Sequence, residues 1–446
     1  MTDAPPTDIT LQMRDPMIKP SLEALSPAAV LSQSIILPCG AMLPNRLAKA
    51  AMSEQLGDAT QAPTEGLVRL FGRLAAGGAG LLITGNVMID RSALGEPGNV
   101  VVEDDRDLPL LQRWAAAATA VGVPIWPQLN HPGRQSPAFL SPEPVAPSAV
   151  QLTLGRGAFA RPRALTVAEI EALIIRFATT ASVLKRAGFT GVQLHGAHGY
   201  LISQFLSPLV NQRTDDWGGT PEKRLRFLLA IVAAVRAAVG RDFPIGVKLN
   251  SADFQKGGFE EAESMAVIEA LETAGIDLLE ISGGSYESPV FMTAVQASTR
   301  RREAYFLEYA ERVRAKTRLP LMVTGGFRSA AAMSDAVRTG AADIVGLARP
   351  LALEPDLPRR LLQGESVASL VEPRRTGLRQ LDSLAEILWY NHQLQRMGAG
   401  REPDPNLGPW RSIVVGLLVN CRNGLRRLPI FRQWARGWPW RNLSDR

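Results

Sequence analysis

The chain has 446 residues, of which 46% are hydrophobic and 21% charged, a composition typical of a globular protein. Its net charge of +6 arises in residues 401–446, where nine Arg outnumber three acidic residues, while the remainder is neutral with 40 basic and 40 acidic residues. The basic balance therefore belongs to a tail and does not indicate nucleic-acid binding. The two cysteines, Cys39 and Cys421, are too few for a disulfide framework or a four-Cys zinc site.

The N-terminal sequence MTDAPPTDIT is polar and acidic, which is not the pattern of a secretory signal. No uninterrupted apolar run reaches the ~18 residues that a membrane-spanning helix needs. Together with the scarce cysteines, these observations lead us to expect a cytoplasmic protein.

Residues 1–33 are Pro-rich and weakly patterned, so we expect an N-terminal extension there. From Ile35 onward, short runs rich in β-branched residues alternate with longer helical patterns, which predicts βαβ units and a parallel sheet. Strands are expected at 47–52, 80–84, 124–130, 191–195, 245–250, 278–282, 319–324 and 342–347. Helices are expected at 63–76, 108–121, 167–187, 221–239, 260–274 and 329–339.

Eight strands with intervening helices favour an α/β fold of the (β/α)₈ TIM-barrel type over residues 34–374. An open, doubly wound sheet is the alternative. Thr166 followed by Glu169 predicts a capping box at the start of one of these helices. Residues 131–165, rich in Pro and Gly, break the alternation, and in a barrel they would form a long loop on the catalytic face.

In a barrel, functional side chains gather at the carboxyl ends of the strands. Three of the four histidines lie at two such ends, and His195, His198 and Tyr200 are close together in the sequence. Two imidazoles could bind one carbonyl oxygen and stabilise an enolate, with a phenol to supply the proton. The alternatives are a structural role or a metal site, but two His lack a third ligand, so no metal is expected.

Small residues and one cation follow the last two strands as Gly325-Gly326 and Ala348-Arg349. This is where such barrels usually bind a phosphate, which predicts a phosphorylated ligand. At the ends of the third and fifth strands, Gln128 could bond a ring bearing carbonyl and N–H groups. Lys248 could hold negative charge on that ring, or it could be a Schiff-base lysine.

These residues lie in segments that resemble the Old Yellow Enzyme family of FMN-dependent ene-reductases, the NADH:flavin oxidoreductases. The segments are NRLAKAAMSE (45–54), PQLNHPGRQ (127–135), GVQLHGAHGYLISQFLSPLVNQRTDDWGGTPEKRLRFLL (191–229), GVKLNSADF (246–254), VTGGF (323–327) and ADIVGLARPL (342–351). The long fourth-strand segment is the most specific of them. The chain lacks the Cys cluster and the second GxGxxG domain of longer members, so it resembles the short, barrel-only form.

The resemblance implies a barrel that binds FMN at its mouth, is reduced by NADH or NADPH, and passes a hydride to a small activated alkene. His195 and His198 would bind the substrate's carbonyl oxygen, and Tyr200 would donate the proton. The implied FMN-binding residues are Ala50, Ala51, Met52, Ser53, Asn86, Gln128, Lys248, Gly325, Gly326, Ala348 and Arg349.

Some positions depart from the family pattern. Ala51 replaces a common Pro, Ser53 stands where relatives have Cys or Thr, Asn86 replaces a small residue, and Lys248 replaces a frequent Arg. None of these changes removes the implied mechanism. The main alternative function is an oxidative flavoenzyme of the amine demethylase or dehydrogenase type on the same barrel. A non-catalytic flavin binder and a flavin-free aldolase-like barrel are further alternatives.

Residues 375–446 are expected to form a helical, basic tail. Residues 378–397 have the pattern of an amphipathic helix that closes the barrel's end or packs on a second subunit, so a homo-oligomer is one possibility. Residues 410–440 mix Trp and aliphatic residues with Arg, which fits a weak membrane-surface contact. On sequence alone we favour a different prediction for this segment, namely a helix on which the aliphatic parts of the Arg side chains cover the barrel surface.

Overall fold

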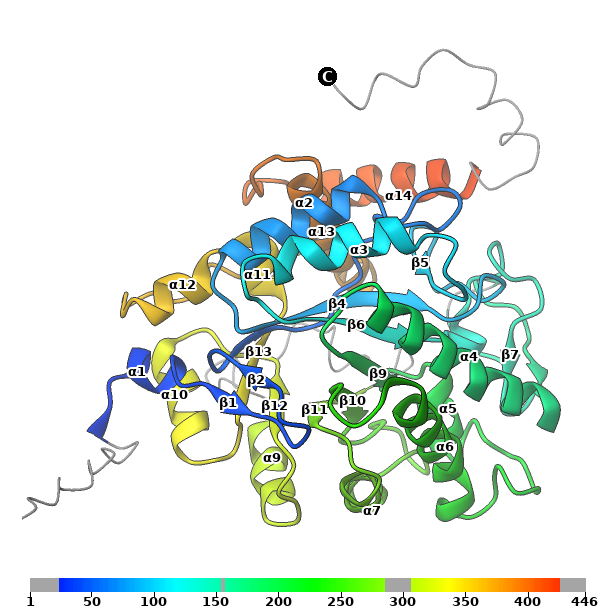
Figure 1. The fold of residues 1–446 in the computed structure, drawn as a ribbon. Helices are drawn as coiled ribbons and strands as arrows, with labels where there is room; N and C mark the ends of the chain where they lie inside the picture. The colour runs from blue at the N-terminus through cyan, green and yellow to red at the C-terminus, as the bar shows by residue number, and fades with distance from the viewer. Residues whose placement is uncertain (1–23, 153, 155–156, 285–305, 426–446) are drawn as a thin grey trace, which may run out of the picture.

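The computed structural model describes residues 24–152, 154, 157–284 and 306–425 (Figure 1). Its centre is a ring of eight parallel strands. The ring is closed because β3 pairs with β4 on one side and with β13 on the other, which confirms the barrel and excludes the open sheet. In order around the ring, the strands are β3 (Leu47–Lys49), β13 (Ile344–Leu347), β12 (Leu321–Thr324), β11 (Leu278–Ser282), β10 (Ile245–Asn250), β9 (Val192–Gly196), β6 (Ile125–Asn130) and β4 (Leu81–Met88).

Helices surround the strands, and the predicted ones are present with ends shifted by no more than two residues. At the start of α4, the Thr166 side chain and the Glu169 side chain form the expected capping box. The predicted helices are α2 (Glu65–Ala76), α3 (Leu108–Thr119), α4 (Val167–Arg186), α6 (Pro221–Val239), α7 (Glu261–Thr273) and α10 (Ala330–Arg338). Shorter helices that were not predicted are α1 (Pro27–Leu31), α5 (Leu201–Leu206), α9 (Leu307–Arg314), α11 (Arg349–Leu353) and α12 (Leu357–Leu362).

The second barrel strand differs from its prediction. It was expected to end at residue 84, but β4 continues to Met88, with an irregularity in its pairing to β6 between Ile83 and Asn86. Gly85, which the sequence presents as a strand end, lies inside the strand. A Cβ there would come within 2.4 Å of both Glu54 Oε2 and the Met52 carbonyl oxygen, so the glycine permits a close approach rather than a turn.

The base of the barrel is filled by side chains. The two-stranded hairpin of β1 (Ile35–Ile36) and β2 (Met42–Leu43) brings Leu37 and Leu43 against the first residues of the barrel strands. Above them Trp126 is fully buried inside the ring. Gly191 makes room for it, since a Cβ at that position would lie 2.5 Å from the indole nitrogen. The lower layers of the barrel are therefore packed core, and any open space lies toward the mouth.

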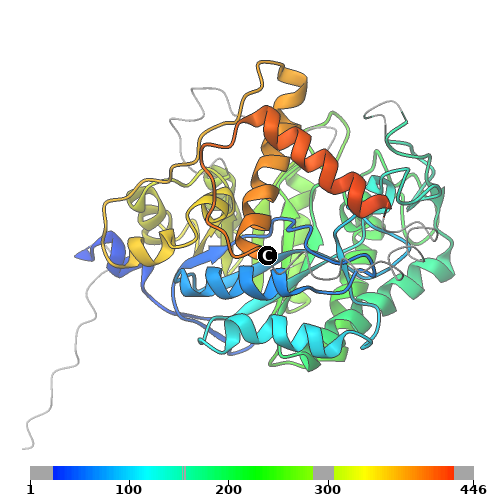
Figure 2. The same ribbon diagram turned by 90° about the horizontal axis from the view of Figure 1, so that it is seen from above.

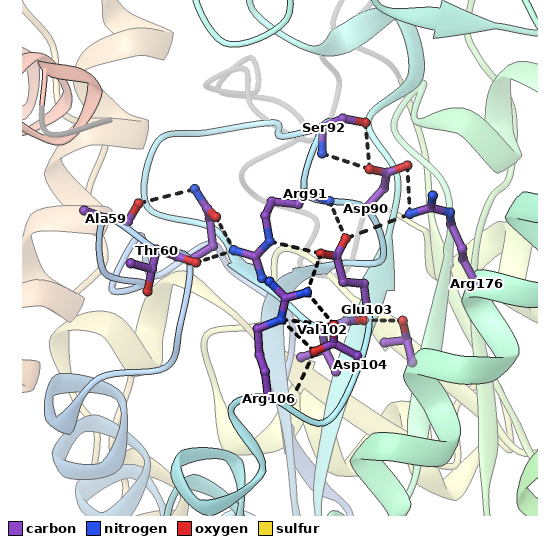
Figure 3. A network of polar contacts seen from close by, with 12 residues as sticks. Ala59, Thr60, Asp90, Arg91, Ser92, Val102, Glu103, Asp104, Arg106 and Arg176 are labelled. Atoms are coloured by element: carbon purple, nitrogen blue, oxygen red, sulfur yellow. Dashed lines mark hydrogen bonds and ion pairs between the residues drawn. The ribbon is translucent and has the colours of Figure 1, made fainter. Parts of the chain in front are cut away.

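The loop after β4 is held by a network of ion pairs and hydrogen bonds (Figure 3). Arg91 Nε lies 3.0 Å from Glu103 Oε1, and Arg91 also donates to the Thr60 carbonyl oxygen. Arg176, on α4, lies 3.3 Å from Asp90 Oδ2. Because these pairs are partly exposed, each contributes less than about 1 kcal/mol. Their joint effect is to fix the loop between its neighbours. The short strand β5 (Val100–Val101) in this region pairs with the end of β4.

The segment after β6 forms the expected long loop. Its described residues include a 3₁₀ turn, η2 (Gly133–Gln135), and the short strand pair β7 (Val145–Ala146) and β8 (Arg163–Ala164). Both ends of the described chain pack on the barrel. Val30 and Leu31 of α1 belong to the main hydrophobic core. At the other end, α13 (Arg379–Gly398) packs against α2 and α11, and α14 (Pro409–Leu425) lies outside α13 (Figure 2). The boundaries at residues 33 and 374 stay predictions.

Candidate active site

A cavity of about 260 Å³ opens at the carboxyl ends of the barrel strands. All the site residues expected from the sequence line it, except Ala50 and Gly326. Ala50 is fully buried in the barrel interior, and its N–H donates to the Leu347 carbonyl oxygen at 2.9 Å. Gly326 directly follows Gly325, which does line the cavity. The expected residues on its wall are Ala51, Met52, Ser53, Asn86, Gln128, His195, His198, Tyr200, Lys248, Gly325, Ala348 and Arg349.

A chain of buried hydrogen bonds runs beneath the cavity from β6 to β12. Gln128 Nε2 donates to Gln193 Oε1 at 2.7 Å, and Gln193 Nε2 donates to Glu280 Oε2 at 2.7 Å. Glu280 is fully buried, lies 2.9 Å from Lys248 Nζ and accepts from Thr324 Oγ1. Its carboxylate therefore balances the Lys248 charge that faces the cavity. Sequence reasoning missed Glu280, although a single charge inside the apolar strand LLEIS was a usable signal.

A second buried ion pair supports the segment that follows β3. Lys49 Nζ donates to the Ile83 carbonyl oxygen at 2.9 Å and lies 3.7 Å from Glu54 Oε1, which accepts the Gly85 N–H. Burial lowers the pKa of Lys49 and raises the pKa of Glu54. The pair ties the turn that carries Met52 to β4. Neither partner was predicted, because a Lys and a Glu near a strand end also suit an exposed surface.

His195 is held as a neutral hydrogen-bond donor. Its Nδ1 accepts the Ala197 N–H at 3.3 Å, and burial together with the Lys248 charge holds the pKa of the ring well below its usual value. A neutral ring that accepts at Nδ1 carries its proton on Nε2. That nitrogen has no hydrogen-bond partner among the described residues, so it is available to a ligand oxygen in the cavity.

His198 and Tyr200 complete the group. The rings of His198 and Tyr200 lie 5.0 and 4.8 Å from the His195 ring, both edge to face. His198 Nε2 lies 2.7 Å from Ser282 Oγ, and burial holds the pKa of this ring well below its usual value too. His198 adopts a φ of +62°, an uncommon conformation for a residue with a side chain. The tight turn brings both rings and the phenol to one side of the cavity.

The opposite side of the cavity has the features of an anion site. Gly325 and Gly326 have φ values of +127° and +82°, which residues with side chains rarely adopt. Arg349 is the first residue of α11 and its side chain is about one-third exposed. The Arg349 guanidinium lies 3.3 Å from Glu386 Oε2, and this carboxylate also accepts the Arg374 N–H.

Helix α13, which the sequence predicted at 378–397 as a helix that closes the barrel's end or packs on a second subunit, forms a wall of the cavity, and its lining residues were not predicted. Glu386, Ile387, Tyr390 and Asn391 all line the cavity, spaced as one face of a helix. In the amide orientation that gives both its N–H and its C=O a partner, Asn391 donates to the Ser53 carbonyl oxygen at 3.1 Å and accepts from Gln55 Nε2 at 2.9 Å. Asn391 and Glu386 therefore attach this helix to the β3 turn on one side and to Arg349 on the other.

Ser53 is held from a second direction as well, because its hydroxyl donates to Glu96 Oε2. Glu96 lies in the loop that follows β4, and burial raises the pKa of its carboxyl group. Glu96 also lines the cavity, and no pattern in the sequence indicated this position.

These residues fit a flavin mononucleotide. The buried Asn86 Oδ1 has no hydrogen-bond partner among the described residues and lies at the cavity, as expected for an atom that a ligand satisfies. A planar ring would meet Gln128 and the Lys248 ammonium, and a phosphate would meet two glycines and Arg349. Residues 39–367 match the NADH:flavin oxidoreductase / NADH oxidase family.

The chain belongs to the NADH:flavin oxidoreductase family. It is 39% identical over 374 residues to an NADH-dependent flavin oxidoreductase of Hypocrea jecorina, covering 77% of this chain and 92% of the relative. The fold matches that of an old yellow enzyme homologue from Zymomonas mobilis with a TM-score of 0.66 and 26% identity, covering 76% and 94% of the two chains. Morphinone reductase in complex with tetrahydroNAD matches with a TM-score of 0.65 and 26% identity, covering 77% and 92%.

As an NADH:flavin oxidoreductase family member, the chain is an NAD(P)H:flavin oxidoreductase with FMN as its flavin. The matched segment includes every site residue expected from the sequence. It ends at residue 367, so the α13 wall of the cavity lies outside it.

Proposed function

We propose that this NAD(P)H:flavin oxidoreductase reduces the carbon–carbon double bond of an α,β-unsaturated carbonyl compound. The observation that carries the proposal is the neutral His195–His198–Tyr200 group on the cavity wall. Bound FMN, once reduced by the nicotinamide, supplies the hydride. A small enone fits the remaining requirements, because its single carbonyl oxygen needs hydrogen-bond donors and its α carbon needs a proton.

The two imidazoles act on the carbonyl oxygen. His195 donates its Nε2–H to this oxygen. His198 donates to the same oxygen from Nε2, the atom that contacts Ser282 Oγ in the structure, and it either gives up that contact or keeps it alongside the new one. Neutral donors withdraw electron density as negative charge develops on this oxygen, without themselves giving up a proton. The Tyr200 hydroxyl then delivers the proton to the α carbon, a role suited to a phenol at the edge of a buried site.

At the cofactor, the chain's residues hold and polarise the ring. Gln128 and the Lys248 ammonium would bond its polar edge, and Ser53 and Asn86 would contact it from the first two strands. Gly325, Gly326, Ala348 and Arg349 would hold the phosphate. Of the expected set, Ala50 supports the site only through its backbone and its packing.

An anaerobic experiment tests the proposal. The purified yellow protein is bleached with NADH or NADPH and then mixed with cyclohexenone. We expect the flavin absorbance to return and cyclohexanone to form in equal amount. Absorbance that returns only with oxygen, or a flavin that is bleached by an amine and not reoxidised by the enone, would contradict alkene reduction and favour an oxidative enzyme.

A further inference from the structure

Helix α14 lies on the outside of the molecule (Figure 2). It exposes a stripe of apolar side chains. Trp410, Val414, Leu417 and Leu418 recur at helical spacing, with exposed fractions of 49%, 56%, 48% and 64%. The side of the helix that faces α13 buries Ser412 and Ile413 and places Gly416 against Leu388. The helix is therefore anchored to the protein by one face, while the side chains of the stripe stay about half exposed.

Other exposed apolar side chains lie in the same part of the chain. Of the fifteen large hydrophobic residues exposed in the described structure, seven fall within residues 370–418. The Trp410 indole N–H donates to the Thr376 carbonyl oxygen at 3.1 Å, which places the stripe beside the loop that carries Leu378, itself 53% exposed. Single exposed apolar residues are ordinary, but a concentration of them marks an interaction surface.

The positive charge of this region indicates which kind of partner the apolar stripe would bind. Residues 405–444 contain seven Arg and no acidic residue, and they hold four of the chain's eight Trp. A second copy of the chain docked by the same face would bring arginine-rich segments together, and like charges oppose such a contact. An anionic lipid surface complements both properties, since headgroups attract Arg and the interface accepts Trp and aliphatic side chains.

We infer that α14 is a peripheral membrane anchor, which binds anionic bilayers through the stripe of Trp410, Val414, Leu417 and Leu418. Within the described residues, no helix has the length and apolarity needed to cross a bilayer, so the anchor would lie in the interface. The inference does not depend on the proposed alkene chemistry. It is an alternative to the prediction that the aliphatic parts of the Arg side chains in residues 410–440 cover the barrel surface, and residues 426–440 of that segment lie outside the described residues.

Co-sedimentation of the full chain with vesicles tests the inference. The vesicles contain phosphatidylcholine alone or phosphatidylcholine mixed with phosphatidylglycerol. The test variant is Val414→Glu/Leu418→Glu. The control is Val167→Glu/Ile175→Glu, which makes the same charge change at two exposed apolar residues of α4. We expect wild type and control to pellet with the mixed vesicles, and the α14 variant to bind at least roughly tenfold more weakly.

Three results would overturn the inference. The wild type could stay in the supernatant with the mixed vesicles, it could bind equally well to vesicles with and without phosphatidylglycerol, or the α14 variant could bind as tightly as the control. Sedimentation velocity without lipid covers the remaining case. A wild-type dimer that the α14 variant converts to monomer, without any lipid binding, would assign this face to self-association. If the double variant does not fold, Leu417→Gln is a milder change on the same stripe.

Discussion

At the residue scale, Tyr200 is the side chain on which the proposed chemistry depends most. The residue is 7% exposed, and its ring lies edge to face with that of His195. The proposal separates two half-reactions, because the phenol is needed to protonate a substrate carbon and not to accept hydride from the nicotinamide.

We expect Tyr200→Phe to slow enone-dependent reoxidation by about 10²–10⁴-fold while leaving NADH-dependent bleaching nearly unchanged. Stopped-flow absorbance of the flavin measures the two steps separately. Tyr309→Phe is the matched control, because Tyr309 bonds Ser264 away from the cavity. Equal slowing of both half-reactions would argue that Tyr200 supports the site's structure and does not donate the proton.

His131, at the end of β6, gives the fold a dependence on pH. Burial lowers the pKa of this residue to about 4, from an ordinary value of 6.5. As the pH falls below 6.5, His131 becomes protonated in the unfolded chain, whereas in the folded chain it becomes protonated only near pH 4. The folded state therefore loses stability as the pH falls from 6.5 to about 4.

The slope from one such group is at most about 1.4 kcal/mol per pH unit. We therefore expect the unfolding free energy of His131→Gln to fall less steeply than that of wild type between these two pH values. Urea unfolding at a series of pH values measures the difference. Parallel curves for the two proteins would show that folding does not lower the pKa of His131.

At the scale of the element, α13 links two parts of the cofactor site that are far apart in the sequence. Asn391 bonds the Ser53 carbonyl oxygen, and Glu386 lies beside Arg349. The helix thereby fixes both the turn that we expect to face the flavin ring and the cation that we expect to bind the phosphate.

Asn391→Ala removes two hydrogen bonds that hold the β3 turn in place, and since each contributes on the order of 1 kcal/mol, we expect FMN binding to weaken by up to roughly thirtyfold. Titration of the apoprotein with FMN, followed by quenching of flavin fluorescence, measures the dissociation constant. His392→Ala, the next residue of the same helix and not part of the cavity wall, serves as control. If both variants bind FMN like wild type, α13 only covers the site.

At the scale of the whole molecule, much could be predicted from the sequence because short-range patterns determine it. The alternation of strand and helix patterns predicted the barrel, and local signals such as the Thr166–Glu169 capping box predicted where helices begin. Side chains at strand ends could be assigned to one mouth because all strands of such a barrel run in the same direction.

What could not be predicted depends on contacts between distant segments. Glu280 balances Lys248 only once β10 and β11 are paired. Gly85 continues a strand instead of ending it because Glu54 and the Met52 carbonyl approach it closely. The residues of α13 reach the cavity by packing across the mouth, and neither amphipathic spacing nor a resemblance that stops earlier in the chain could place them there.

The packed base of the barrel also restricts how the two substrates can take turns. Because Trp126 and the hairpin residues Leu37 and Leu43 fill the lower layers, the cavity at the mouth would have to receive both the nicotinamide and the proposed enone. The oxidised nicotinamide then has to depart before the acceptor enters. Double-reciprocal plots at several fixed enone concentrations should accordingly give parallel lines, and intersecting lines would mean that both molecules are bound at once.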